Sequence, residues 1–239
     1  GGSGSTDGGA GALAALGMRL LDVRGRELPE GGAALAGLAH VDTAGLRTPP
    51  AELVLWCDVE APLTGPRGAA SVFGPQKGAT PDEVRVLEAA LARLGAVLGG
   101  DPDAAGSGAA GGTAYGLRTA WGATLASGAA AVAELTGLDA AIASADLVIT
   151  GEGRIDASTA TGKVVGSVLG RADAAGVPVA LVAGAIDASA ASGREALALV
   201  DLAPSDAAAI SDAPTWLARA GEALARDRRV VRNGRDGSR

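Results

Sequence analysis

The sequence predicts an α/β protein with two lobes: a mixed α/β lobe with glycine-rich loops over residues 1–143, and a Rossmann-like, parallel-sheet lobe over residues 144–239. Apolar runs at Leu147–Ile149 and Val179–Ala183 have the length and branching typical of strands, and a helix is predicted between them at Val164–Ala175. Such a strand–helix–strand unit implies parallel neighbouring strands. The 239 residues suffice for one large domain or two small ones, and with 2% aromatic residues the core must consist of Ala, Val and Leu.

Composition excludes several classes of function. Cys57 is the single cysteine, which rules out an internal disulfide and a cysteine-cluster metal site, fits a reducing compartment such as the cytoplasm, and is interpreted as a small core residue. His40 is the single histidine, so a His-based triad or zinc site has no second histidine. A net charge of −7 argues against nucleic acid as a partner. No apolar run is long enough to predict a membrane span, and no signal peptide begins the sequence.

The first element is a loop of glycines and hydroxyl residues at Gly1–Gly11 that carries one charge, Asp7, and is followed by GALAALGMRLL. Leu13, Leu16 and Leu20 have helical spacing, and a loop followed by a helix is the order expected of a phosphate-binding turn. The alternative is that these glycines only permit close backbone packing. A functional loop is favoured because an acidic residue is unusual among such small ones.

Polar residues with frequent Gly and Pro follow at Asp22–Pro50, and a strand is predicted at Glu52–Val59 with Asp58 at its exit. Arg67 and Lys77 then occur in two similar phrases, GPRGAA and GPQKGA. Proline locks φ and holds neighbouring groups in place, so these cations are candidates for ligand contact. The alternative is that both phrases are plain connecting turns.

The region Pro81–Leu98 has the features of a well-capped helix, with Thr80 as its N-cap and Glu83 in the capping-box position. A glycine-rich loop follows at Gly95–Gly112, whose glycines either let backbone approach a ligand or form a flexible connection. Further elements are predicted as helices at Ala129–Leu135, Asp139–Ser144 and Pro214–Arg226 and as a strand at Ala198–Leu202. The arginine-rich tail from Asp227 is interpreted as a solvated, frayed end rather than a nucleic-acid arm.

The most informative stretch is DLVITGEGRIDASTATGK at Asp146–Lys163. A short strand that ends in glycine predicts a buried parallel strand with a loop at its carboxyl edge, where open α/β sheets bind ligands. The loop offers Glu152, Arg154 and Asp156, then hydroxyls, Gly162 and Lys163 near the start of the next helix, where free N–H groups favour anions. The spacing differs from the Walker pattern G-x-x-x-x-G-K-(S/T), so an ordinary strand-to-helix turn stays the alternative.

These residues carry a resemblance. DLVITGEGRID, followed by TATGK and GVPVALVAG, resembles the C-terminal half of the bacterial type 1 glycerate kinases, whose pattern is close to DLVITGEGR(I/L)D-x-Q-(S/T)-x-x-GK. Three further blocks agree in order and spacing: GGSGSTDGGAGALAALG at Gly1–Gly17, APLTGPRGAASVFGPQKGAT at Ala61–Thr80, and AGSGAAGGTAYGLRTAWGATLASG at Ala105–Gly128. Members of that family begin with a strand resembling APDSFKGS well before the first block, so the chain resembles a member without its N-terminal third.

The resemblance implies a two-lobed glycerate-kinase-like fold and a kinase that uses ATP and Mg²⁺ to phosphorylate D-glycerate, a small-molecule substrate. Phosphoryl transfer needs cations and backbone donors around phosphates, a carboxylate for magnesium and a group that orients the acceptor hydroxyl. The predicted catalytic residues are Asp7, Glu152 and Asp156, the last two also as metal ligands. The predicted substrate-binding residues are Ser3, Arg67, Lys77 and Arg154. The predicted phosphate- or nucleotide-binding residues are Gly8, Gly9, Gly151, Gly153 and Lys163.

Two other readings compete with the kinase. The chain is alternatively a non-catalytic α/β module that binds nucleotides or anions, or an inactive remnant whose fold persists. A Rossmann oxidoreductase is disfavoured, because no G-x-G-x-x-G follows a strand with an acidic residue about twenty positions further on.

Overall fold

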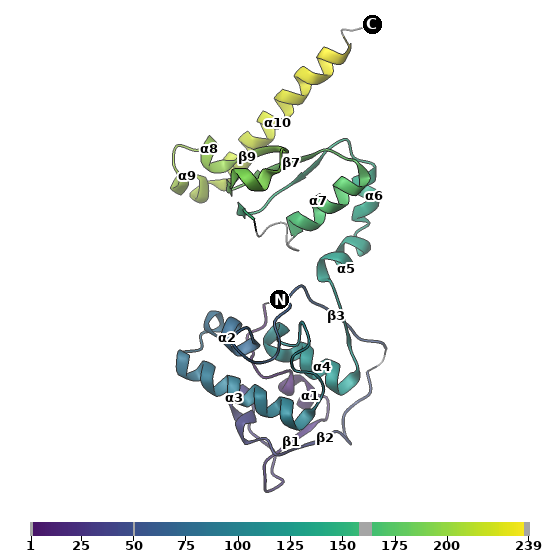
Figure 1. The fold of residues 1–239 in the computed structure, drawn as a ribbon, viewed down its shortest axis with the longest axis vertical. Coiled ribbons are helices and arrows are strands. Elements are labelled where there is room, and N and C mark those ends of the chain that lie inside the picture. Colours follow the sequence, from purple (N-terminus) through teal and green to yellow (C-terminus); the bar gives the residue numbers. More distant parts are fainter. Residues whose placement is uncertain (1, 50, 158–163, 237–239) are drawn as a thin grey trace. The chain divides into compact units, whose positions relative to one another are not determined.

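A computed structural model describes residues 2–49, 51–157 and 164–236 (Figure 1). The chain divides into two compact units, Gly1–Ala131 and Val132–Arg239. This division falls within helix α5 (Gly128–Leu135), whereas the sequence places the boundary after residue 143. Both units combine helices with parallel strand pairs, which confirms the predicted mixed α/β class.

The first unit is organised around helix α3 (Pro81–Leu98). Its ends follow from the sequence as predicted. The Thr80 hydroxyl accepts the backbone N–H of Glu83, the Glu83 carboxylate accepts the backbone N–H of Thr80, and Pro81 begins the helix. The capping box therefore confirms the predicted start of this helix.

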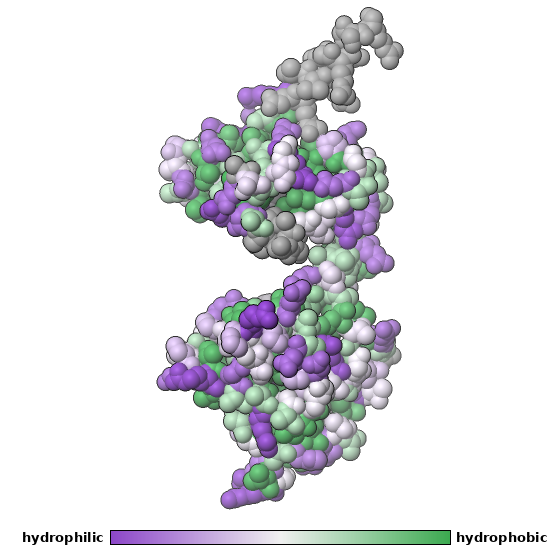
Figure 2. Space-filling model, in the orientation of Figure 1, coloured by the Kyte–Doolittle hydropathy of each residue, from purple (hydrophilic) through white to green (hydrophobic). Residues whose placement is uncertain are grey.

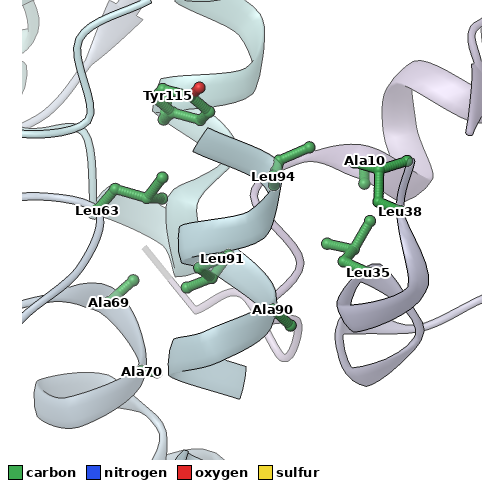
Figure 3. Close-up of a cluster of buried hydrophobic side chains, with 10 residues drawn as sticks. All are labelled: Ala10, Leu35, Leu38, Leu63, Ala69, Ala70, Ala90, Leu91, Leu94 and Tyr115. Carbon is green, nitrogen blue, oxygen red and sulfur yellow. The ribbon is translucent and has the colours of Figure 1, made fainter. Parts of the chain in front are cut away.

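Figure 3 shows why α3 is central to the first unit: its buried face lies between apolar side chains from several other segments. Leu91 and Leu94 are 0% and 1% exposed, and Tyr115 and Leu63 pack with them. A fully buried leucine contributes about 1.5–3 kcal/mol relative to an exposed one. The cluster consists of Ala10, Leu35, Leu38, Leu63, Ala69, Ala70, Ala90, Leu91, Leu94 and Tyr115. Leucine and alanine thus supply this core, as the low aromatic content requires.

Two short strand pairs complete the sheet structure of the first unit. Strand β1 (Arg19–Leu21) pairs antiparallel with β2 (His40–Asp42), and β3 (Val54–Trp56) pairs parallel with β4 (Thr124–Ala126). The strand predicted at Glu52–Val59 is therefore present but shorter. Its Cys57 lies just after β3 and is only partly buried, outside the core clusters, so the prediction of a core cysteine is wrong.

The helix predicted from the GALAALGMRLL stretch is shorter than expected. Helix α1 (Ala10–Ala15) ends where Gly17 adopts φ +104°, and the N–H groups of Gly17 and Met18 bond back to the carbonyls of Ala14 and Leu13. A positive φ of this kind ends a helix, so Leu20 lies in β1 instead. The remaining helices of this unit are η1 (Gly32–Gly37), α2 (Ala69–Phe73), η2 (Pro75–Lys77), η3 (Ala109–Gly112) and α4 (Thr113–Trp121).

The second unit contains the predicted parallel sheet. Strands β5 (Val148–Thr150), β7 (Val179–Ala183) and β9 (Glu195–Ala198) pair in the order β5-β7-β9, all parallel. Helix α7 (Val164–Ala175) precedes β7, which confirms the strand–helix–strand unit. Beyond the carboxyl ends of β5 and β7, a second parallel pair forms between β6 (Arg154–Ile155) and β8 (Ala185–Ile186).

Two sequence predictions for the second unit fail. Ile149 in β5 is 56% exposed rather than buried, and it lines a hollow at this edge of the sheet. The strand predicted at Ala198–Leu202 is instead helix α8 (Leu199–Leu202). The register explains this change: Ala183, the last residue of β7, faces Ala198, and the next available carbonyl, that of Gly184, accepts the Val200 N–H outside the ladder.

Helix α6 (Leu138–Ala143) lies within one residue of the helix predicted at Asp139–Ser144, and α10 (Ala213–Asp236) begins near the predicted start but continues past the predicted end at Arg226. Two further helices, η4 (Ala188–Ala191) and α9 (Asp206–Ser211), were not predicted from the sequence. None of the helices in the described ranges is both long and apolar enough to cross a membrane. On the face drawn in Figure 2, polar and apolar residues are interspersed over each unit.

Candidate functional site

The glycine-rich loop at the start of the chain receives a lysine from a distant segment. The Lys77 ammonium donates to the Ser3 hydroxyl at 3.2 Å and to the Ser5 carbonyl. Lys77 is the last residue of η2, whose Pro75 fixes the preceding turn. The fold therefore joins two of the predicted substrate-binding residues, Ser3 and Lys77, across 74 positions of sequence. The acceptor carbonyl of Ser5 carried no signal in the sequence.

The backbone of this loop is rich in unused donors. Within the described part of the chain, no backbone N–H from Gly2 to Thr6 donates a hydrogen bond. Successive free N–H groups in a turn form concavities that bind anions. Burial lowers the pKa of Lys77, and the negative charge of Asp7 partly opposes that shift.

Asp7 has a structural task that the sequence did not reveal. Its Oδ1 accepts the backbone N–H of Gly9 at 3.0 Å and its Oδ2 accepts that of Gly11 at 2.9 Å. These are the otherwise unpaired donors at the start of α1, and a carboxylate also favours that end of a helix. Capping is therefore a structural reason for an acidic residue among small ones, and the catalytic role of Asp7 stays a prediction.

Gly8 and Gly9, predicted to offer N–H groups to phosphate, use those groups within the protein. The Gly8 N–H donates to the Gly111 carbonyl at 3.0 Å, and the Gly9 N–H is the one that Asp7 accepts. Both residues are buried with φ of +65° and +78°, and a Cβ on Gly8 would overlap the Leu94 side chain. Close packing thus accounts for both glycines. The unused N–H groups of this loop belong to the earlier residues Gly2–Thr6.

Arg67 stands apart from this cluster. It is exposed in the turn where the Gly68 N–H bonds the Gly65 carbonyl, and its side chain makes no hydrogen bond or ion pair with described residues. The turn is anchored from α3, because the Glu88 carboxylate accepts the Gly65 N–H. The second oxygen of Glu88 is buried without a partner among the described residues. Glu88 is a positioning residue that sequence reasoning missed.

The second predicted site lies at the carboxyl edge of the sheet in the second unit. A Cβ on Gly151 would overlap the Val182 carbonyl of β7, so glycine is required for the loop to pass this closely. The Gly153 carbonyl accepts the Ala185 N–H at 3.2 Å, and the Glu152 carbonyl accepts that of Gly184 at 3.3 Å. These bonds fix the loop against the segment that follows β7.

Arg154, Glu152 and Asp156 of this loop all interact with other residues. The Arg154 guanidinium donates to Asp187 Oδ1 at 2.8 Å, with the side chains 63% and 45% exposed. Glu152 and Asp156 both interact with other residues of the chain. Asp187, which follows β8, was not predicted as a site residue. An acidic residue just after a strand could have indicated it, as it did for Asp58. Lys163 and the preceding residues 158–162 lie outside the described residues.

A hollow of about 810 Å³ adjoins this loop. Its wall is mostly apolar and includes Ile149, Val182 and Leu217, while Glu152 and Arg154 lie at its polar side. No group of three or more His, Cys, Asp or Glu that could hold a metal occurs within the described ranges. A magnesium ion in a phosphoryl-transfer site commonly takes one or two carboxylates plus substrate phosphates, and the two acids of this loop fit that donor set.

The fold and these two loops define the class first: an α/β protein with glycine-rich, charged loops suited to small anionic ligands. The model of the glycerate kinase family matches residues 1–229. The chain belongs to the glycerate kinase family.

Named proteins and a solved structure are similar to this chain over part of their own length. A glycerate kinase of Bacillus subtilis (strain 168) is 48% identical over 126 residues, which are 50% of this chain and 33% of that protein. A glycerate 2-kinase of Escherichia coli (strain K12) is 40% identical over 135 residues, 54% of this chain and 35% of its own. A crystal structure of a protein assigned as glycerate kinase 2 from Salmonella typhimurium LT2 superposes with a TM-score of 0.64 and 44% identity, covering 78% of this chain and 54% of that one. The chain thus spans about a third to a half of these relatives.

Proposed function

We propose that this protein takes part in transfer of the γ-phosphoryl group of ATP to a hydroxyl group of D-glycerate, which yields ADP and a phosphoglycerate. Family membership and the names of the relatives support glycerate as the acceptor. The structural observation that carries the proposal is the loop Gly151–Asp156, which brings two carboxylates and a guanidinium to the carboxyl edge of a parallel sheet.

In the proposed reaction the glycerate hydroxyl oxygen attacks the γ-phosphorus, the bond between that phosphorus and the β–γ bridging oxygen breaks, and a carboxylate accepts the hydroxyl proton. Bound Mg²⁺ would neutralise charge on the phosphate oxygens. Asp156 and Glu152 are proposed to hold this ion or to orient the hydroxyl. Arg154 is proposed to bind the glycerate carboxylate, because a guanidinium has five N–H donors and a single acceptor on Asp187 does not saturate it.

The two neighbouring glycines, Gly151 and Gly153, are proposed to let a phosphate approach the backbone of the same loop. Lys163 stays a proposed phosphate ligand on the strength of the sequence alone. Arg67 stays a proposed substrate contact, with its exposed position in favour of a ligand-facing role.

Coupled measurement of ADP formation tests this proposal, with D-glycerate as acceptor and the phosphoglycerate isomers resolved by chromatography. The assay uses this chain and, where the chain is part of a longer gene product, that product as well. We expect ADP formation that depends on glycerate. The Asp156→Asn variant should lower its rate by orders of magnitude. Nucleotide binding without any glycerate-dependent ADP would overturn the kinase and support the non-catalytic binding module.

A further inference from the structure

Lys77 separates two hollows of opposite electrostatic character in the first unit. On one side a hollow of about 520 Å³ is lined by Lys77 together with three carboxylates, those of Asp7, Glu30 and Glu83. On the other side lies a hollow of about 590 Å³, in which Lys77 is the only charged residue of the described lining. An anion is repelled by the first hollow and attracted by the second.

The second hollow, which we call the Lys77 hollow, is also lined by three residues of the glycine-rich loop. Gly2, Ser3 and Gly4 line it, and none of their backbone N–H groups donates a hydrogen bond to a described residue. Ser3 adds a hydroxyl that already accepts from Lys77. Three N–H groups, a hydroxyl and an ammonium group are more donors than a two-oxygen carboxylate needs, and they match the several acceptor positions of a phosphate.

The opposite wall of this hollow is suited to the uncharged part of a small ligand. It includes Phe73, the single phenylalanine of the chain, and the partly exposed Val59, with Gln76 as an uncharged hydrogen-bonding group. Small-molecule sites typically combine such apolar walls with a few polar groups that fix orientation.

We propose that the Lys77 hollow is a phosphate site, in which the backbone N–H groups of Gly2–Gly4, the Ser3 hydroxyl and the Lys77 ammonium hold a phosphate or phosphate monoester. An ammonium has three N–H donors, and Ser3 and Ser5 account for two of them. The third reaches a ligand without breaking the bonds that position the side chain.

This site deepens the proposed function, and the identity of its ligand rests on that function, since a kinase has two sources of phosphate. One is the nucleotide and the other is the phosphorylated acid. The shared chemistry is a tetrahedral oxyanion, and inorganic phosphate is the minimal probe for it. Binding of that probe requires no turnover, so it is tested separately from the kinase reaction.

Titration of the ¹⁵N-labelled chain with inorganic phosphate, followed by the amide signals of Gly2–Thr6, tests the site. Saturable shifts are expected in this loop, and Lys77→Met should weaken the fitted affinity by about tenfold or more, as expected for loss of a charge-assisted hydrogen bond. Arg85→Met is the matched control, because it removes one exposed cation from α3 while leaving the hollow intact. Ser3→Ala should weaken binding less than Lys77→Met does.

Two further titrations identify the source of the phosphate. ADP and 3-phosphoglycerate are titrated separately, and the ligand that shifts the amide signals of Gly2–Thr6 at the lower concentration is assigned to the hollow. D-glycerate alone should shift this loop more weakly than inorganic phosphate. Unchanged amide signals at saturating phosphate, or equal weakening by Lys77→Met and Arg85→Met, would overturn the proposal. Phosphate binding without catalysis would leave the site in place and remove only the kinase function.

Discussion

The Lys77 ammonium lies 3.2 Å from the Ser3 hydroxyl, although 74 positions separate the two residues in sequence. This contact places a cation beside the segment Gly2–Thr6, whose backbone N–H groups donate no hydrogen bond to a described residue. We expect four measurable effects, one each from this arrangement, the packing of Gly8, the hydrogen bonds of Asp7 and the loop in the second unit.

Phosphate affinity should depend on pH through Lys77. Burial lowers the pKa of this ammonium from its ordinary value of 10.5, and the nearby carboxylate of Asp7 partly opposes the shift. Because only the protonated form attracts an anion, affinity should fall as pH rises through this lowered pKa, before 10.5 is reached. Calorimetric titration with phosphate across alkaline pH measures the fall.

Lys77→Arg provides the control for this pH dependence, since a guanidinium stays charged throughout the range. Its phosphate affinity should therefore persist to higher pH than that of the unmodified chain. The carboxylates of Glu30 and Glu83 share the acidic hollow with Asp7 and remain unchanged in both proteins. Parallel pH profiles for the unmodified chain and the Lys77→Arg variant would contradict the assignment.

Gly8→Ala should destabilise the first unit by more than its backbone conformation alone requires. Its φ of +65° strains any residue with a Cβ, by about 1–2 kcal/mol, and the new atom would also overlap Leu94. Gly25→Ala is the control, because Gly25 has φ +74° and open space around it. Denaturant unfolding of both variants separates the two costs. Equal losses would refute a packing role for Gly8.

Asp7→Ala should lower the free energy of unfolding by about 1 kcal/mol, because it removes the N-terminal cap of α1. Asp7→Asn keeps one acceptor oxygen and should cost less. Glu60→Ala, at an exposed carboxylate outside these bonds, measures the effect of charge alone. A loss for Asp7→Ala no larger than that for Glu60→Ala would exclude capping. If Asp7 is also catalytic, as the resemblance implies, Asp7→Asn should lower turnover by orders of magnitude, which is measured in the same variant.

Asp187→Ala should alter substrate binding more than stability. The pair with Arg154 is exposed, so its loss should change the free energy of unfolding by less than about 1 kcal/mol. If Arg154 binds the glycerate carboxylate, loss of its orienting partner should raise KM for glycerate with a smaller change in kcat. Asp173→Ala, which breaks the comparable pair with Arg194, should leave KM unchanged. An equal rise in both variants would assign the effect to general disturbance.

Local patterns in the sequence were sufficient wherever neighbouring residues decide the structure. Thr80, Pro81 and Glu83 contain the whole capping box, so the start of α3 was predictable. The strand–helix–strand unit followed from the spacing of apolar runs in the same way. The end of α1 and the change from β9 to α8 were not predictable in this way. The first depends on the conformation of a glycine, and the second on where the partner strand ends.

The sequence by itself determined the α/β class, the family and the residue types available for anion binding, since these are properties of composition and of ordered motifs. Only the tertiary structure decided that Asp7 caps a helix, that Gly8 and Gly9 serve packing, that Arg154 pairs with Asp187, and that Lys77 joins Ser3. Hydrogen bonds form between groups that folding brings within about 3 Å of each other. That distance cannot be inferred from the separation of the two residues in the sequence.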